Sequence, residues 1–122
     1  MLIHKARGPY TGMLDLPGGS LEDGERLEET LSREVLEETG CIITSCHQLI
    51  AESILFDHID AKTGEPARLR HVGILYHATT DDEPSVQKDG QDSDGATWLP
   101  LTKIDKSKVT PFIPIALKAY VG

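Results

Sequence analysis

Positive charge and aromatic side chains are both scarce in this chain of 122 residues. Lys and Arg number 12 against 20 Asp and Glu, which gives a formal net charge of −8, and aromatic residues make up 5% of the sequence. Non-specific binding to nucleic acid depends mainly on basic contacts to phosphate. We therefore expect no stable nucleic-acid binding, and a polyanionic substrate would need a metal ion to supply positive charge.

Cysteine and long apolar runs are also scarce. The two cysteines, Cys41 and Cys46, fit neither a zinc-ligand spacing nor a disulfide framework, and reduced thiols are typical of the cytosol. No stretch is long and apolar enough to span a membrane, and the first residues lack a signal-peptide pattern. These absences predict a cytoplasmic protein without a membrane partner, and the length predicts one domain over residues 1–122.

A glycine turn followed by an acidic helix is the most informative stretch. Residues 17–19, Pro-Gly-Gly, are a strong turn signal. Ser20 or Asp23 is the expected cap of the helix that follows. Gly40 is its expected end, because glycine is common just past a helix C-terminus.

The apolar stripe of this helix runs into carboxylates. Leu27, Leu31 and Val35 are four residues apart and predict a stripe that faces the core. Neighbouring positions on that face hold Glu34, Glu37 and Glu38. Carboxylates this close raise each other's pKa unless a cation neutralises them, and Mg²⁺ takes oxygen ligands. Arg33 is a candidate to hold one carboxylate in place. On charge count alone, a solvated acidic face is the simpler interpretation.

This stretch resembles the Nudix box of the Nudix hydrolase superfamily. The box reads Gly, five residues, Glu, seven residues, Arg-Glu, an aliphatic residue, any residue, Glu-Glu, any residue, Gly, an aliphatic residue. The matching residues are Gly19, Glu25, Arg33, Glu34, Val35, Glu37, Glu38 and Gly40. Cys41 departs from the pattern, but cysteine packs as a small buried residue. So long a match favours a metal site over a solvated face.

The resemblance implies roles for the charged residues of the match. The catalytic set would be Glu34, Glu37 and Glu38 with Arg33, and Glu25 would be a supporting residue. The metal ligands would be the three glutamates and the carbonyl of Gly18, with Mg²⁺ as the cofactor and Mn²⁺ as a substitute. A further ligand often comes from a loop before a tryptophan-containing strand, here residues 96–99. The candidates in that loop are Asp89 first, then Asp92 and Asp94.

The implied reaction is hydrolysis of a pyrophosphate bond in a nucleoside diphosphate linked to another moiety. The substrate types considered are a nucleoside triphosphate, a nucleotide sugar and ADP-ribose. Signatures of the NADH, coenzyme A and ADP-ribose subfamilies are absent downstream of the box. Three alternatives remain: a catalytically silent nucleotide-binding or sensor module, an isoprenoid diphosphate isomerase, and an RNA 5′-end hydrolase, which the negative charge disfavours.

Residues for substrate binding are less clear from the sequence. Arg7 and Arg70 are candidate phosphate contacts, although charges on exposed strands are an equally simple interpretation. Phe56 is a candidate wall for the base. The other aromatic candidates for that wall are Tyr10, Tyr76 and Phe112.

The expected fold class is α/β (α+β), an α/β/α sandwich around a mixed, curved sheet, as the resemblance implies. Two β-rich runs, from residue 42 to 56 and from residue 69 to 79, predict a hairpin. Residues 111–121 predict a closing helix with Ile113, Leu117 and Tyr120 or Val121 toward the core. The first strand of the family fold is expected to be missing or shortened. The core would then be completed by upstream residues or by a partner chain, and a homodimer is therefore possible.

Overall fold

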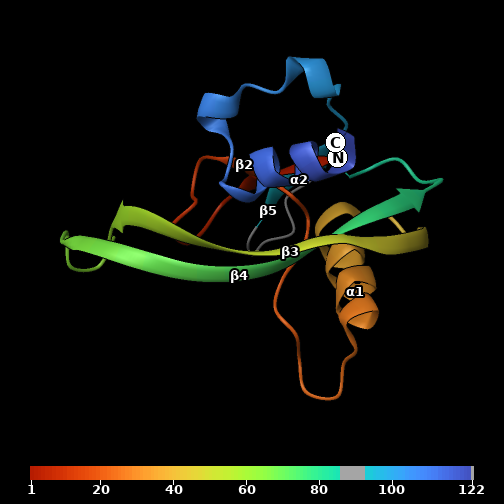
Figure 1. Cartoon of the computed structure of the whole chain (residues 1–122), viewed down its shortest axis with the longest axis horizontal. Helices are drawn as coiled ribbons and strands as arrows, with labels where there is room; N and C mark the ends of the chain where they lie inside the picture. Colours follow the sequence, from red (N-terminus) through yellow and green to blue (C-terminus); the bar gives the residue numbers. More distant parts are fainter. Residues whose placement is uncertain (86–92, 122) are drawn as a thin grey trace.

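Two small antiparallel sheets and two helices make up the fold in the computed structural model, which describes residues 1–85 and 93–121 (Figure 1). The strands are β1 (Leu2–Lys5), β2 (Leu14–Asp15), β3 (Ile43–Ile59), β4 (Pro66–Thr80) and β5 (Ser93–Thr97). The helices are α1 (Leu27–Thr39) and α2 (Phe112–Val121), and two short 3₁₀ turns, Leu101–Lys103 and Lys106–Lys108, precede α2.

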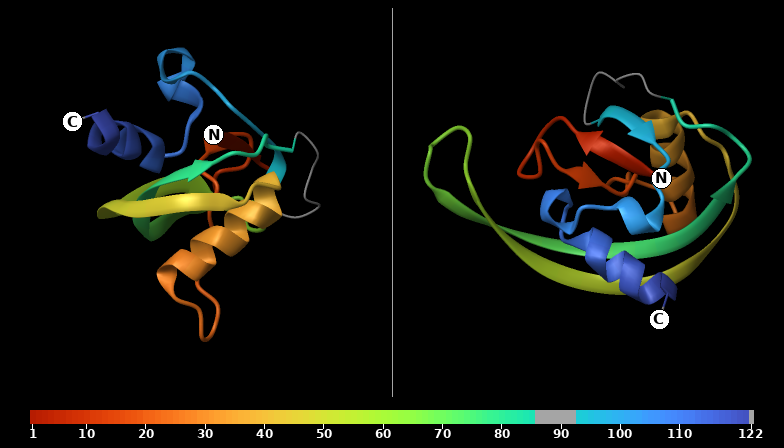
Figure 2. Two further views of the ribbon diagram at one scale, coloured as in Figure 1. Left: turned by 90° about the vertical axis from the view of Figure 1, so that its right-hand side faces the viewer. Right: turned by 90° about the horizontal axis from the view of Figure 1, so that it is seen from above.

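The strands pair as β2-β1-β5 in one sheet and as a long β3–β4 hairpin in the other. Every ladder between these strands is antiparallel, and an isolated parallel bridge joins Leu14 to Val109. The β3–β4 hairpin curves around the smaller sheet, and α1 and α2 lie on opposite sides of the hairpin (Figures 1 and 2). The expected fold class is confirmed, and so is the hairpin.

The core lies between the small sheet and α2. Leu2 of β1, Val109 and Ile113 of α2 form its buried cluster. Partly buried side chains pack against that cluster, namely Leu14, Leu16, Leu99, Ile104 and Leu117. Because Leu14 and Leu16 directly precede the glycine turn, the core fixes the chain that leads into it.

Helix α1 begins later than the sequence predicts. Neither Ser20 nor Asp23 caps it, and the Ncap residue is Arg26, whose backbone N–H donates to Glu29 Oε1 at 3.1 Å. The reason is Gly24, whose φ of +81° breaks the helical path. The predicted end is right, because Gly40 takes the left-handed conformation and its N–H donates to the Leu36 carbonyl.

Three further expectations need correction. Leu27 is 38% exposed, because it is the first residue of α1. Strand β5 ends at Thr97, so Trp98 lies outside it and is 49% exposed. In α2, Ile113 faces the core as predicted, but Tyr120 and Val121 are exposed.

No helix in the described part of the chain is both long and apolar enough to cross a membrane.

Candidate functional site

The glycine turn and α1 approach each other so closely that one glycine is required. A Cβ atom added to Gly19 would lie 2.5 Å from both carboxylate oxygens of Glu34, far inside contact distance. The Glu34 carboxylate therefore occupies the space that any other residue at position 19 would fill. At Gly18, by contrast, an added Cβ would meet nothing within 4 Å.

Glu38 joins the same turn to the buried face of α1. The residue is 4% exposed, and its Oε1 atom accepts a hydrogen bond from the Gly18 N–H at 3.1 Å. Its Oε2 atom is buried as well. A buried carboxylate is costly unless hydrogen bonds or cations compensate it. The apolar stripe that ends at Val35 is therefore followed, as the sequence predicts, by a carboxylate that faces inward.

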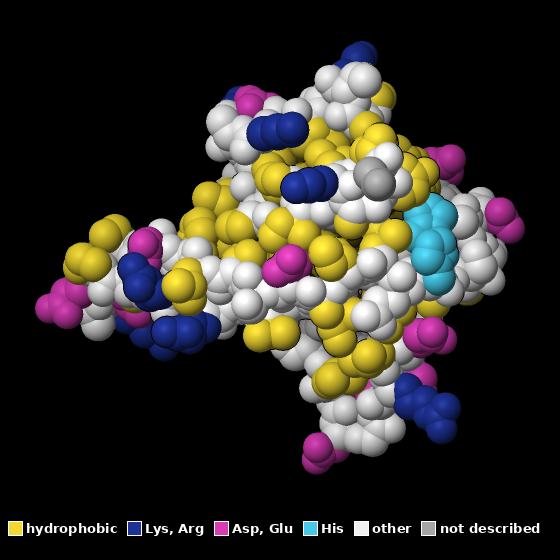
Figure 3. Space-filling model, viewed as in Figure 1, with side chains coloured by type: hydrophobic (Ala, Val, Ile, Leu, Met, Phe, Trp, Pro, Cys, Tyr) yellow, Lys and Arg dark blue, Asp and Glu magenta, His cyan; other side chains and the backbone are white. Residues whose placement is uncertain are grey.

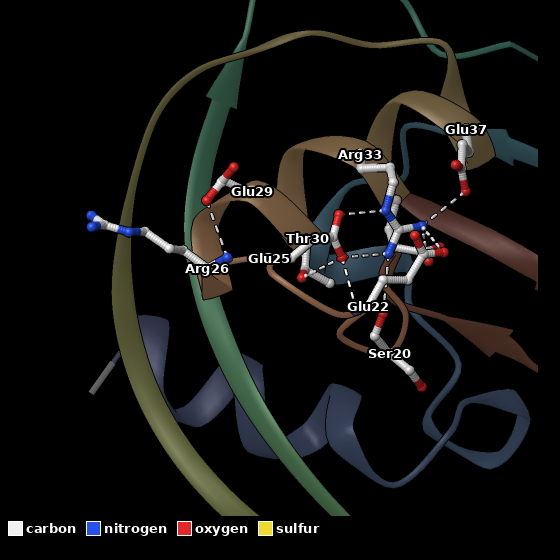
Figure 4. A network of polar contacts seen from close by, with 9 residues as sticks. Ser20, Glu22, Glu25, Arg26, Glu29, Thr30, Arg33 and Glu37 are labelled. Atoms are coloured by element: carbon white, nitrogen blue, oxygen red, sulfur yellow. Dashed lines mark hydrogen bonds and ion pairs between the residues drawn. The ribbon is translucent and has the colours of Figure 1, made fainter.

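Arg33 ties the other carboxylates together (Figure 4). Its guanidinium binds Glu25 through Nε to Oε2 at 2.7 Å and through Nη2 to Oε1 at 2.9 Å. Its Nη1 atom donates to Glu34 Oε1 at 2.7 Å and to Glu37 Oε2 at 3.3 Å. Nη2 also donates to the Ser20 carbonyl at 3.1 Å. One planar side chain thus fixes the glycine loop and two glutamates of α1.

This network shifts the pKa values of Glu25 and Arg33. The hydrogen bonds from Arg33 lower the pKa of Glu25 from 4.5 to about 2, helped by the backbone N–H of Glu22 and the hydroxyl of Thr30. The same pairing, first with Glu25 and then with Glu34, raises the pKa of Arg33. Glu25 is therefore ionised at all ordinary pH values and acts as the anchor of Arg33.

The three glutamates of α1 do not form a closed metal cage in this arrangement. Among the described residues, no three His, Cys, Asp or Glu side chains converge as a metal-binding group. The physical reason is that carboxylates repel one another without a cation between them. Arg33 instead donates hydrogen bonds to one oxygen of Glu34 and one of Glu37, and the Gly18 N–H donates to Glu38.

The other predicted site residues lie apart from this network or outside the described residues. Asp89, the first candidate for a loop ligand, lies outside them, as does Asp92. Arg7 lies between β1 and β2, and Arg70 is an exposed residue of β4 that pairs across the hairpin with Leu55. Phe56 packs edge-on against Tyr10, with ring centroids 4.7 Å apart. Their roles in substrate binding stay predictions.

A hollow of about 640 Å³ adjoins the network at the N-terminal end of α1. It is lined by Leu21, Glu25, Arg26, Leu27, Glu28, Glu29 and Tyr76. Glu25 belongs both to this hollow and to the Arg33 network. Of the four aromatic candidates for a base-binding wall, Tyr76 is the one that lines it. The sequence offered no signal for the hollow, because it depends on where β4 passes α1.

Comparison with known proteins agrees with this geometry. A sequence model of the NUDIX domain matches residues 1–119. The chain belongs to the Nudix hydrolase family. Its fold is similar to that of a MutT NUDIX hydrolase from Burkholderia pseudomallei, with a TM-score of 0.70 and 30% identity over 97% of this chain and 84% of that one.

Curated Nudix relatives are similar over shorter stretches. An ADP-ribose pyrophosphatase of Methanocaldococcus jannaschii is 48% identical over 42 residues, which are 34% of this chain and 25% of that protein. The nucleoside triphosphatase NudI of Salmonella schwarzengrund is 39% identical over 74 residues, 57% of this chain and 48% of NudI. The matches thus span between a quarter and a half of these relatives' lengths. The family membership confirms the resemblance carried by residues 19–41.

Proposed function

We propose that this Nudix protein hydrolyses a pyrophosphate bond in a nucleoside diphosphate linked to another moiety, with Mg²⁺ as its cofactor and Mn²⁺ as a substitute. The observation that carries the proposal is the close approach of the glycine turn to α1. Gly19 makes room for the Glu34 carboxylate, and Gly18 binds Glu38. A solvated acidic face would need neither contact.

The donor set at this turn fits a hard divalent cation. Glu34 and Glu37 each accept a hydrogen bond from Arg33 with one oxygen, which leaves Glu34 Oε2 and Glu37 Oε1 for a metal. Glu38 and the Gly18 carbonyl are proposed to add further oxygens. The hydrogen bond from the Gly18 N–H to Glu38 Oε1 already holds these two residues together. Oxygen donors of this kind are those that Mg²⁺ prefers. Asp89 remains the proposed additional ligand.

In the proposed mechanism, the side chains around the turn hold and orient the reacting groups. A bound divalent ion would neutralise charge on the phosphoryl oxygens. Arg33 fixes the directions of Glu34 and Glu37 through Nη1. The side chain of Glu37 is 55% exposed, against 16% for Glu34. In this proposal the attacking water approaches from the Glu37 side, where the site is open to solvent.

The substrate class follows from chemistry more than from any one relative. The two curated relatives are named for ADP-ribose and for nucleoside triphosphates, and both compounds contain a pyrophosphate attached to a nucleoside. Arg7 and Arg70 are the proposed phosphate contacts. For the base, Phe56 is the candidate from sequence and Tyr76 has the better position, because its hollow reaches Glu25.

A substrate panel with matched variants tests the proposal. Phosphate release would be measured for nucleoside triphosphates, ADP-ribose, nucleotide sugars and dinucleoside polyphosphates, with coupled phosphatase and with or without Mg²⁺. We expect a metal-dependent activity that Glu37→Gln and Glu38→Gln lower by orders of magnitude. Glu52→Gln, at an exposed position of β3, is the matched control and keeps full activity.

Two outcomes would contradict the proposal. Normal turnover in both Glu37→Gln and Glu38→Gln would overturn the assignment of the site. No hydrolysis across the panel, together with intact nucleotide binding, would instead favour a silent nucleotide-binding module.

A further inference from the structure

Two histidines face each other across the β3–β4 hairpin, outside the Nudix box. His47 and His77 are direct partners in the antiparallel register. Their ring centroids are 5.0 Å apart, and the rings are inclined by 44°. Opposite residues of an antiparallel pair point to the same face. Figure 3 shows histidine side chains gathered into one patch on the face that also carries α2.

The end of α2 supports one ring of this pair. Tyr120 stacks on His77 with a centroid separation of 5.2 Å and an interplanar angle of 16°. His47 is exposed and His77 is half-buried, so water and small ions reach the pair. The two imidazoles therefore come from neighbouring strands, and one of them is held by an aromatic neighbour.

The separation of the rings fits a shared metal ion. A nitrogen-bound ion at about 2.0 Å lies about 3.2 Å from the centroid of each imidazole. Two centroids 5.0 Å apart then correspond to a nitrogen–metal–nitrogen angle of about 100°. That angle lies between the square-planar and tetrahedral values, so the separation of the rings is compatible with one ion bound by both.

We propose that His47 and His77 form a second metal site, which takes a borderline first-row transition-metal ion, with Cu²⁺ bound most tightly. Imidazole suits Cu, Ni and Zn, and affinities for such sites rise to a maximum at Cu²⁺. No larger group of metal-ligating side chains gathers among the described residues, so water completes the coordination. The ligand class differs from that of the carboxylates on α1, which favour Mg²⁺.

Cu²⁺ titration followed by electron paramagnetic resonance tests this site. The full chain is used with millimolar Mg²⁺ present, so that the carboxylates of α1 are occupied. We expect one tightly bound Cu²⁺ whose spectrum shows coupling to two imidazole nitrogens. Substitution of a direct ligand should weaken Cu²⁺ binding by at least about tenfold, since loss of an outer partner alone typically costs that much.

Matched variants separate ligation from packing. His77→Phe keeps an aromatic ring against Tyr120 but removes the nitrogen, and His47→Ala removes the other ligand. His4→Ala is the control, because His4 is exposed on β1 and pairs across with Leu14. We expect the first two variants to lose the two-nitrogen spectrum and His4→Ala to retain it.

Either of two results would overturn the proposal. One is a wild-type spectrum without two coupled nitrogens. The other is Cu²⁺ affinity in His47→Ala equal to that of wild type. Circular dichroism of each metal-free variant confirms that the hairpin has folded, so a lost signal reports on ligation.

Discussion

Gly19→Ala is the substitution whose effect follows most directly from the structure. The new Cβ would lie 2.5 Å from both Glu34 oxygens, whereas ordinary contact begins at 3.4 Å. The carboxylate must therefore retreat by at least about 0.9 Å (3.4 − 2.5), since its carbon atom lies closer still, and it must do so against its 2.7 Å bond to Arg33. Because a misplacement of about 1 Å can cost about 10²-fold in rate, we expect kcat/KM to fall by about that factor.

The assay compares kcat/KM and thermal stability of Gly19→Ala and Gly18→Ala on the substrate found in the panel. Stability should change little in Gly19→Ala, because the displaced group is the end of a flexible side chain. Gly18→Ala should lose much less activity, since its Cβ enters open space. If Gly19→Ala were as active as wild type, or no worse than Gly18→Ala, the close approach of the turn to Glu34 would not matter for catalysis.

Further predictions follow from the same network and from the core. Arg33→Lys keeps the charge but loses the planar fork that binds both oxygens of Glu25, so turnover should fall by about 10- to 100-fold while the fold is unchanged. Turnover equal to that of wild type would contradict the orienting role of Arg33. The pKa of Glu25 is about 2 in the folded protein against an ordinary value of 4.5, so its contribution to stability is complete above about pH 4.5 and is lost as pH falls toward 2. In denaturant titrations, the free energy of unfolding of Glu25→Gln should therefore fall less than that of wild type between pH 4.5 and pH 2. Ile113→Ala should lower the free energy of unfolding by about 2–5 kcal/mol, and a loss below about 1 kcal/mol would argue against its place in the core. Gly73→Ala should destabilise by about 1–3 kcal/mol, because its Cβ would lie 2.7 Å from Phe112 Cζ; unchanged stability would mean that α2 docks differently.

The sequence was most informative where chemistry depends on spacing along one helix. Glu34, Glu37 and Glu38 share a face of α1 because helical periodicity requires it, and Gly40 ends the helix as predicted. The start of α1 was missed, because a capping-type residue at position 20 or 23 says nothing about the positive φ of Gly24. Local propensity therefore located one end of the helix and not the other.

Tertiary features were beyond the reach of the sequence pattern. The register of the hairpin shifts between Gln48 and Ile50, and that shift helps to set which residues of β3 and β4 meet. The pairing of His47 with His77 and the position of Tyr76 beside α1 both depend on it. The sequence alone carries no signal that His47 and His77 lie opposite each other.

The proposed metal site at the glycine turn and α1 is tested most directly by Mn²⁺ binding to the wild-type chain and to Glu38→Gln. Mn²⁺ reports on the proposed Mg²⁺ site through its own paramagnetic signal, without any substrate. We expect tight Mn²⁺ binding in wild type, displacement by Mg²⁺, and an affinity at least about tenfold weaker in Glu38→Gln. Equal affinity in the two proteins, or Mn²⁺ that Mg²⁺ does not displace, would contradict a metal site at the glycine turn and α1.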